Sequence, residues 1–457
     1  MPRTAIAWFR RDLRLADNPA LTHAVTHADT VASVYVAADP AAPFAPGNGS
    51  RAWLERSLSA LRASLEECGA DLVRLNGPSL GTLPALAAAY GARLVTCTRD
   101  WSPAGMAEET AVRDALSAAG IELFVAESQL LVEPDRVRTG AGTPYSVFTP
   151  YSRAWAAAWG PSTPLPTPAR IPGAAIPRGG VPDTAPGSVA DAPTITASAF
   201  PSDLDAWWTP GELGAQQRLA AFSATCVRDY DRDRDRPAVS ATSELSAHLA
   251  FGEVSPRQVV AAVLAKSEES EAWAFIRQLA WREFSYHVLH AHPATQSEPL
   301  RPQYAAFPWR DDEDGTQAWL DGRTGFPLVD AGMRQLAKSG WVHNRVRLVA
   351  ASFLVKDLLV PWQTGEVAFR ERLVDYDPAA NAFNWQWVAG SGADAAPYFR
   401  VFNPTTQARR FDPLGEYVRR WVPEYGTPEY PAPVVDHAEA RTRALAALSA
   451  MSSGPTI

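Results

Sequence analysis

The chain has 457 residues, 46% of them hydrophobic and 20% charged, which excludes a single small module as well as a disordered or fibrous protein. Two or three domains are expected at this length. A net charge of −8 argues weakly against a nucleic-acid partner. Three cysteines without a CxxC pair indicate neither a disulfide framework nor a zinc or iron–sulfur site. The 16 tryptophans are the unusual feature.

Membrane and export signals are not evident in the sequence. No apolar run reaches the roughly 18 residues that a membrane span needs. Near the N-terminus, Arg10, Arg11 and Arg14 stand where a signal peptide needs its apolar stretch. We therefore expect a cytoplasmic protein without a membrane partner.

The first 130 residues alternate short apolar or β-branched runs with helical stretches, which is typical of a doubly wound parallel sheet. The predicted strands are residues 5–9, 31–36, 72–75, 94–97 and 121–125. The glycine-rich loop that follows the first strand at an ordinary NAD site is absent. An α/β domain of another kind is therefore predicted for residues 1–130.

Composition changes in the middle of the chain. Residues 161–201 hold ten prolines in 41 positions, which excludes helix interiors and indicates an interdomain linker; we assign residues 131–205 to it. Helical patterns without strand-like runs then cover residues 212–230, 255–266, 271–290, 327–339, 342–359, 367–374 and 437–449. Residues 206–457 are predicted to form an all-helical domain.

The densest mixture of polar and aromatic residues begins at residue 375, where Asp375, Asp377, Asn381 and Trp385 follow one another closely. Burying these polar groups is costly unless each has a partner, and a buried polar ligand supplies such partners. A flavin fits two carboxylates, an amide and a tryptophan well. The alternative is a loop of mutually satisfied polar residues beside core tryptophans.

The segment Thr242-Ser243-Glu244-Leu245-Ser246 comes at a predicted helix start. Hydroxyls and free backbone N–H groups at such a place can hold a pyrophosphate. Plain capping of the helix is the alternative.

One predicted helix combines Gln278, Trp281 and Arg282 at positions i, i+3 and i+4, and Phe275 lies one turn earlier. Residues at this spacing share a helix face. An aromatic ring beside an amide and a guanidinium can stack on an extruded nucleobase and hydrogen-bond its edge. The alternative is a core tryptophan beside a surface ion pair.

Taken together, these motifs resemble the DNA photolyase and cryptochrome family, and most of all the photolyases for cyclobutane pyrimidine dimers. The resemblance runs from residue 3 to about residue 424, and its motifs are residues 8–19, 242–246, 281–284, 340–345, 353–358 and 384–387. It implies an α/β antenna-chromophore domain followed by a helical catalytic domain that holds U-shaped FAD.

The resemblance also implies roles for single residues. Asn381 is similar to the asparagine that faces the reactive flavin nitrogen, and Arg347 would pair with Asp375 beneath the flavin. The implied FAD contacts are Tyr230, Thr242, Ser243, Leu245, Ser246, Phe275, Arg282, Arg347, Asp375, Asp377 and Asn381.

In the family's repair reaction, reduced FAD absorbs light and gives one electron to a dimer flipped out of DNA; the ring splits and the electron returns. By resemblance, Trp281 stacks on the dimer while Gln278, Arg282 and Asn344 hydrogen-bond around it. Together with Asn381, residues Gln278, Trp281 and Asn344 form the expected catalytic set.

Further residues match family positions outside the pocket. Arg234, Arg345 and Gln407 resemble contacts to DNA at the rim. Residues 330–424 carry a local charge of +2 on an acidic chain, so DNA affinity is expected to fall with added salt. Three tryptophans match the family's chain for reducing oxidised flavin, namely Trp385, Trp362 and Trp309.

Two positions depart from the usual pattern of photolyases for cyclobutane dimers. Gln278 stands where they usually carry glutamate and Leu348 where they usually carry methionine, so slower repair is expected. The same glutamine occurs in (6-4) photolyases and animal cryptochromes, and both a (6-4) photolyase and a blue-light photoreceptor with weak repair remain alternatives. Asn344 and Trp281 favour the dimer-repair enzyme over these.

The antenna chromophore is less well marked. The folate-binding members of the family have an Asn-Glu pair after the fourth strand, and residues 101–107 do not match it. We therefore prefer a deazaflavin antenna to methenyltetrahydrofolate, with Arg51 as a candidate contact. A monomer is expected.

Overall fold

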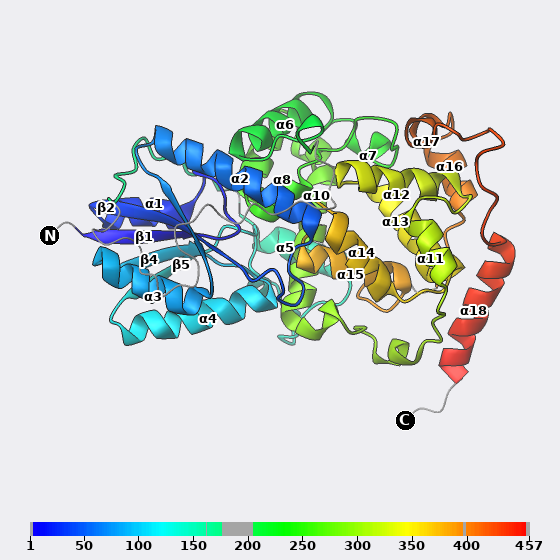
Figure 1. Ribbon diagram of the computed structural model, residues 1–457, viewed down its shortest axis with the longest axis horizontal. Coiled ribbons are helices and arrows are strands. Elements are labelled where there is room, and N and C mark those ends of the chain that lie inside the picture. Colours follow the sequence, from blue (N-terminus) through cyan, green and yellow to red (C-terminus); the bar gives the residue numbers. More distant parts are fainter. Residues whose placement is uncertain (1–2, 161, 176–203, 396–398, 454–457) are drawn as a thin grey trace.

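The computed structural model describes residues 3–160, 162–175, 204–395 and 399–453 (Figure 1). Its N-terminal part is a five-stranded parallel sheet with the strand order β3-β2-β1-β4-β5. The order reverses at β1, as in a doubly wound fold, so the predicted fold class is confirmed. The strands are β1 (Thr4–Phe9), β2 (Thr30–Ala37), β3 (Leu72–Asn76), β4 (Leu94–Thr98) and β5 (Glu122–Ala126).

Both faces of this sheet are covered. On β1, Ile6 and Trp8 belong to one apolar cluster, whereas Ala5, Ala7 and Phe9 belong to another. Alternate residues of a strand point to opposite faces, so each face has its own core. The helices that cover the sheet are α1 (Pro19–His27), α2 (Asn48–Glu67), α3 (Ser79–Tyr90) and α4 (Pro103–Ala118).

The second half of the described chain is mostly helical, and its helices lie in the centre and on the right in Figure 1. No helix in the described ranges combines the length and apolarity needed to cross a membrane. The helices are α5 (Phe148–Ala158), α6 (Glu212–Thr225), α7 (Tyr230–Asp233), α8 (Ser246–Phe251), α9 (Pro256–Leu264), α10 (Glu269–Ala291), α11 (Glu313–Leu320), α12 (Pro327–Ser339), α13 (Asn344–Ser352), α14 (Trp362–Arg372), α15 (Pro378–Ala389), α16 (Pro404–Phe411), α17 (Glu416–Trp421) and α18 (His437–Ser453).

The helix predicted over residues 342–359 is shorter and less regular than its pattern suggested. α13 starts after His343, whose side chain accepts a hydrogen bond from the Arg345 N–H, and it continues as a π-helical turn over Phe353–Asp357. Leu359 then adopts a left-handed backbone with φ of 58°. That conformation cannot continue a right-handed helix, so the chain breaks there before α14.

The segment assigned to an interdomain linker, residues 131–205, is not uniform. Its residues 148–158 form α5, whose Phe148, Tyr151 and Trp155 are buried in the same apolar cluster as residues of α10. Residues 176–203 of the predicted linker lie outside the described residues. The boundaries at residues 130 and 205 stay a prediction, and α5 packs as part of the helical half.

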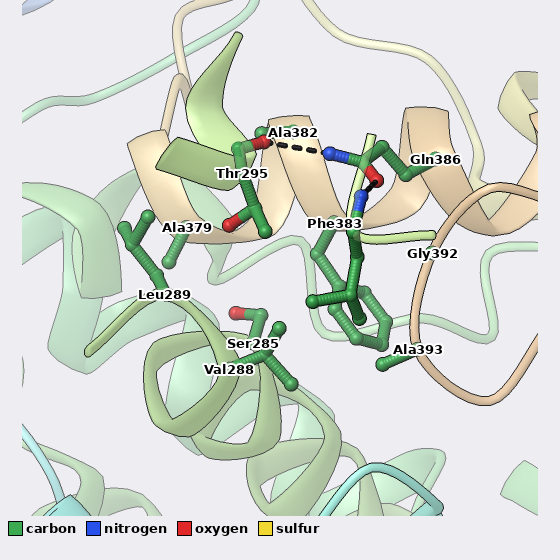
Figure 2. Close-up of a pocket in the computed structure, with 11 residues that line it drawn as sticks. Ser285, Val288, Leu289, Thr295, Ala379, Ala382, Phe383, Gln386, Gly392 and Ala393 are labelled. Carbon is green, nitrogen blue, oxygen red and sulfur yellow. Dashed lines mark hydrogen bonds between the residues drawn. The ribbon is translucent and has the colours of Figure 1, made fainter. Parts of the chain in front are cut away.

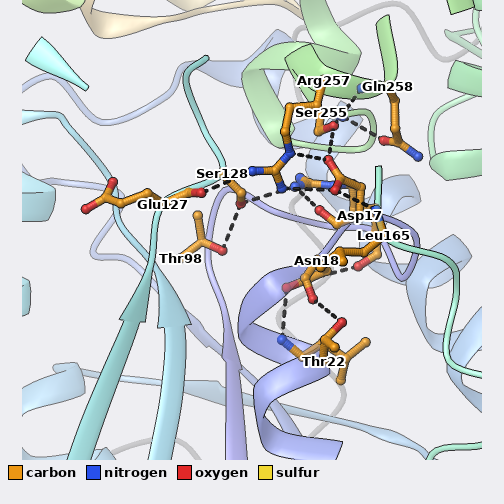
Figure 3. A network of polar contacts seen from close by, with 12 residues as sticks. Asp17, Asn18, Thr22, Thr98, Glu127, Ser128, Leu165, Ser255, Arg257 and Gln258 are labelled. Carbon is orange, nitrogen blue, oxygen red and sulfur yellow. Dashed lines mark hydrogen bonds and ion pairs between the residues drawn. The ribbon is translucent and has the colours of Figure 1, made fainter. Parts of the chain in front are cut away.

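The segment after β1 joins the two halves (Figure 3). Asp17 accepts hydrogen bonds from Arg257 through Nε and Nη2, each at 3.0 Å, and it also accepts from the Ser255 hydroxyl and the Leu165 N–H. Arg14 donates to Gly252 O at 2.8 Å and to Asp17 O at 2.8 Å. Buried charges need such partners, so these residues fix the sheet against α8 and α9.

The start of α2 makes a second contact between the halves. Ser50 donates to Leu373 O at 2.7 Å and accepts from the Tyr376 N–H at 3.2 Å. A Cβ atom on Gly49 would lie 2.3 Å from Arg372 O. Glycine is therefore required for this close approach, which leads into the chain that carries Asp375 and Asp377.

Candidate flavin and lesion site

Two carboxylates stand at the beginning of α15. Asp377 is its N-cap: Oδ1 accepts from the N–H groups of Ala379 and Ala380, both at 3.0 Å, and Oδ2 accepts from the Tyr286 hydroxyl at 2.6 Å. Arg282 of α10 approaches the same carboxylate to 4.0 Å. Burial and the neighbouring Asp377 raise the pKa of Tyr286 well above its usual range, so its hydroxyl remains a donor at neutral pH.

The second carboxylate, Asp375, is paired on one side only. Its Oδ2 accepts from Arg347 Nη2 of α13 at 2.7 Å. Its Oδ1 is buried and has no hydrogen-bond partner in the described ranges. A buried acceptor without a partner is costly, and a ligand carrying an N–H or O–H group would satisfy it. The predicted pair of Arg347 and Asp375 is present in the structure.

The hydroxyl segment lies close to this pair. Ser246 begins α8, and its Oγ accepts from Trp341 Nε1 at 3.2 Å. The Trp341 ring in turn lies 5.9 Å from the Arg347 guanidinium carbon. Thr242 and Ser243 are half-buried, with Leu245 N–H donating to Ser243 Oγ at 3.4 Å. Hydroxyl and cationic groups that suit a phosphate-bearing ligand therefore lie within one region.

Aromatic and aliphatic residues predicted to contact FAD also lie together. Tyr230, Leu245 and Phe275 are buried in one apolar cluster, and the Tyr230 and Phe275 rings meet edge-on at 5.3 Å. These three residues pack in one apolar cluster although they come from α7, the N-cap of α8 and α10.

Asn381 has a partner that the sequence did not reveal. Its Nδ2 donates to Glu366 Oε1 of α14 at 3.0 Å, and Glu366 is also paired with Arg370 at 3.4 Å. Burial raises the pKa of Glu366 above its ordinary value. The orientation of the Asn381 amide is thus fixed by a residue fifteen positions earlier, for which the sequence carried no signal.

The face predicted on α10 is present, and its three residues turn to different partners. Gln278 donates to Ala274 O of its own helix at 3.1 Å, and Arg282 donates to Gln129 O at 3.0 Å. Trp281 stacks on Phe148 of α5, with ring centroids 3.5 Å apart and an interplanar angle of 8°. The sequence missed Phe148 because it falls within the predicted linker.

α13 presents two of the predicted positions. Asn344 is its first residue and is exposed, and Leu348 is half-buried one turn later. Their spacing places them on one side of the helix.

The predicted DNA contacts at the rim come from three separate segments. Arg345 pairs with Asp235 at 2.8 Å and lies over the Phe411 ring of α16 at 4.5 Å. Arg234, next to Asp235 in the chain, lies over the Tyr230 ring at 5.4 Å. Gln407 of α16 has a buried Oε1 without a partner in the described residues. Arg345 therefore contacts the helix that carries Gln407, and Arg234 directly precedes the aspartate that binds Arg345.

The three tryptophans predicted for electron transfer belong to one core. Trp385 and Trp362 are each 2% exposed, and the half-buried Trp309 packs against the same cluster. Trp309 also borders a surface groove of about 780 Å³. The rings closest to Trp385 were not foreseen: Phe369 lies at 5.0 Å and Trp319 at 6.2 Å.

A small cavity lies between α10 and α15 (Figure 2). Its volume is about 10 Å³, roughly the room one water molecule needs, so it is too small for a cofactor. Gln386, which lines it, donates to Thr295 O at 2.7 Å. The cavity is a packing feature beside the candidate site.

Glu283 was also missed, although it lies within a family motif. It is buried on α10 and accepts from the N–H groups of Leu131 and Val132 and from Trp155 Nε1 at 2.6 Å. Burial raises the pKa of Glu283 to about 7. This carboxyl group holds residues 131–132 and α5 on the helix that carries Trp281.

Comparison with known proteins gives the family. Residues 5–169 match the DNA photolyase family and residues 275–428 match the FAD binding domain of DNA photolyase. A deoxyribodipyrimidine photo-lyase of Agrobacterium fabrum is 42% identical, and the match covers 98% of each chain.

Solved structures agree with this result. A bacterial class III photolyase from Agrobacterium tumefaciens has a TM-score of 0.90 at 41% identity, over 99% of this chain and 98% of that one. An archaeal photolyase from Sulfolobus tokodaii with two FAD molecules has a TM-score of 0.81 at 28% identity, over 98% and 100%. A cryptochrome of Synechocystis has a TM-score of 0.84 at 25% identity, over 98% and 99%. The chain belongs to the DNA photolyase and cryptochrome family and carries that family's FAD-binding domain.

Proposed function

We propose that the protein is a deoxyribodipyrimidine photo-lyase that uses light to repair cyclobutane pyrimidine dimers in DNA. The observation that carries the proposal is the 4.0 Å approach of Arg282 to Asp377, because it joins the helix of Trp281 to the carboxylates of the candidate flavin site. When bound and reduced, FAD supplies the photoexcited electron that splits the dimer. The residues of the chain bind the cofactor and the lesion, orient them, and exclude water from the site.

The candidate FAD contacts divide the work by chemistry. Arg347 neutralises Asp375 on one side, which leaves the buried Oδ1 to accept from the ligand. Thr242, Ser243 and Ser246 offer hydroxyls to the phosphates, while Tyr230, Leu245 and Phe275 cover the apolar part. Asn381, held by Glu366, offers its amide to the flavin ring.

Recognition of the lesion rests on α10 and α13. Trp281 would stack on the extruded dimer, with Gln278, Arg282 and Asn344 around it and Arg234, Arg345 and Gln407 on the DNA backbone. Flipping costs least at a damaged site, which favours the lesion over intact DNA. Gln278 has an amide in place of an ionisable carboxyl group, so repair is expected to be slower than with glutamate.

The sequence supports further proposals on electron transfer, the antenna, location and oligomeric state. Trp385, Trp362 and Trp309 would carry electrons to oxidised flavin, and their shared core supports this.

For the antenna chromophore we propose a deazaflavin. In the structure Arg51 donates to Pro46 O at 3.1 Å and to Asn48 Oδ1 at 2.5 Å, so its guanidinium is held in its own loop. A cytoplasmic monomer is proposed.

The deciding experiment compares repair in light and in darkness on duplexes that hold one thymine dimer, one (6-4) photoproduct or no lesion, with the protein's absorption spectrum recorded alongside. Light-dependent repair of the thymine dimer alone supports the proposal. Repair of the (6-4) duplex alone would favour a (6-4) photolyase. Reduced FAD without repair of either would favour a cryptochrome-type photoreceptor.

A further inference from the structure

Asp394, in the chain after α15, adopts a left-handed backbone with φ of 49°. Few residues other than glycine tolerate this region, and aspartate is one of them. Three groups of Asp394 bind three different partners. Its N–H donates to Ser146 O at 2.9 Å, its Oδ1 accepts from the Phe148 N–H at 3.0 Å, and its carbonyl accepts from Trp387 Nε1 at 3.1 Å.

The contact with Phe148 caps a helix from outside. Phe148 is the first residue of α5, and Val147 at the N-cap provides no side-chain hydrogen bond. The first N–H groups of a helix lack partners within it, and a negative charge there is favourable. The carboxylate of Asp394 supplies that charge from a segment 246 residues away in sequence.

Phe148 passes this restraint to Trp281. Its ring is 5% exposed and lies parallel to the indole at 3.5 Å. The preceding residues are held on α10 as well, because the Tyr145 N–H donates to His287 Nε2 at 2.9 Å. One face of Trp281 is therefore covered, and its tilt is set by a ring that Asp394 holds.

We propose that Asp394 is a positioning residue for the lesion pocket: it fixes Phe148 so that Trp281 presents a single open face, at a set tilt, to an extruded base. Its backbone also holds Trp387, which ties α15 to the same point. The inference rests on the proposed function for its consequence on DNA. Asp394 acts through Phe148 and is not proposed to touch substrate or cofactor.

Two substitutions test the acceptor oxygen of Asp394 with residues that both tolerate its left-handed backbone. Asp394→Gly relieves the left-handed conformation and removes the acceptor, whereas Asp394→Asn keeps an acceptor oxygen and a side chain that tolerates the conformation. We expect Asp394→Gly to raise Kd for a dimer-containing duplex by about tenfold. Asp394→Asn should raise it by clearly less. FAD content and Kd for the intact duplex should stay at the wild-type values.

Phe148 provides the second pair. Phe148→Tyr keeps an aromatic ring on Trp281 and should retain the preference for the dimer. Phe148→Leu should lose it as Asp394→Gly does. Equal weakening for damaged and intact DNA in Asp394→Gly would overturn the proposal, because a general loss of structure affects both. Unchanged Kd values for both duplexes in Asp394→Gly would overturn it as well.

A readout without DNA keeps the two proposals apart. The near-ultraviolet circular dichroism of the protein minus that of its Trp281→Phe variant reports the environment of this one indole. The same difference taken in the Asp394→Gly background should be much smaller if Asp394 sets the stack, and an unchanged difference would refute the positioning role. A wild-type protein that shows no preference for the dimer would refute the proposed function, and the dichroism alone would then decide on Asp394.

Discussion

Asn381 and Glu366 are joined by a hydrogen bond of 3.0 Å between an amide and a buried carboxyl group. Their elements, α15 and α14, pack side by side, so the amide cannot turn without breaking this contact. The orientation of Asn381 is thus set before any ligand binds.

The contribution of this hydrogen bond can be tested by measuring the free energy of unfolding. Asn381→Ala leaves Glu366 with one donor fewer in a buried place, and we expect a loss of about 1–3 kcal/mol in the free energy of unfolding. Chemical denaturation of the flavin-free protein measures it. Asn384→Ala is the matched control, because Asn384 is exposed on the same helix and, among the described residues, its side chain donates to Ala380 O alone. Similar losses in both variants would contradict the role of Glu366.

Arg347 is expected to contribute to both FAD binding and the free energy of unfolding. Arg347→Met leaves the buried Asp375 without its cation, and because Arg347 is itself partly exposed we expect a loss of about 2 kcal/mol, below the value for a fully buried pair. The ratio of flavin to protein absorbance should fall in parallel. Arg62→Met breaks an exposed pair with Asp71, and should change stability by less than about 1 kcal/mol. Full FAD occupancy in Arg347→Met would count against Asp375 as a ligand residue.

Gly365 gives a test of the packing around Trp385. A Cβ atom at Gly365 would lie 2.1 Å from the Trp385 ring, so Gly365→Ala should cost about 1–3 kcal/mol by overpacking. The displaced indole should also slow photoreduction of bound flavin, measured by absorbance under illumination. A Cβ atom at Gly81 in α3 would meet no other part of the described chain within 4 Å beyond its own helix backbone and chain neighbours, so Gly81→Ala should be neutral or stabilise by up to about 1 kcal/mol. Unchanged stability and photoreduction in Gly365→Ala would disprove the tight contact.

The lowered pKa of His287 predicts that the stability of the protein depends on pH. Burial lowers the pKa of His287 from its ordinary 6.5 to about 4. The unfolded chain therefore binds a proton between these values while the folded protein does not, so stability is full above pH 6.5 and falls as the pH drops towards 4. About 2 kcal/mol should be lost from this group between pH 8 and pH 5.

The matched variant for this test is His287→Gln, which can accept from the Tyr145 N–H and does not titrate in this range. Denaturation at pH 8 and pH 5 should show a smaller loss in the variant than in the wild type. Parallel curves would show that other groups cause the acid sensitivity.

Gln278→Glu tests the departure at the lesion pocket. If an ionisable carboxyl group assists the splitting of the dimer, the variant should repair a thymine dimer with a higher yield per absorbed photon than the wild type. Kd for the dimer-containing duplex is measured as a control for binding. A yield that stays equal or drops would mean that the amide is not what slows repair.

Much of the fold could be predicted from the sequence because its signals are local. Val31 and Val34 on β2 and the apolar spacing of α2 carry their patterns in the chain itself, and the predicted strands agree with the structure to within one residue at each end. α5 was missed because it falls within residues 131–205, the range assigned to a linker on the strength of the prolines in residues 161–201. The buried Phe148, Tyr151 and Trp155 at positions i, i+3 and i+7 were the signal that could have revealed it.

The candidate site was predictable only in part, for a different reason. A motif identifies Asp375 and Asn381 as polar residues that need partners, but it does not say which distant residue satisfies each one. Glu366, Phe148 and Asp394 come from three other segments. Only the packing of these segments brings the partners within hydrogen-bond distance.

The network at Asp17 has a consequence for modularity. Arg14 is buried, and its partners Gly252 O and Ser128 Oγ come from both halves of the molecule. If the chain were cut between the sheet and the helices, the α/β half would keep Arg14 and Asp17 without their partners Gly252 and Arg257. The helical half would expose Arg257. The two parts are therefore complementary pieces rather than interchangeable modules, and a chimaera that exchanges one half has to carry the residues of this network with it.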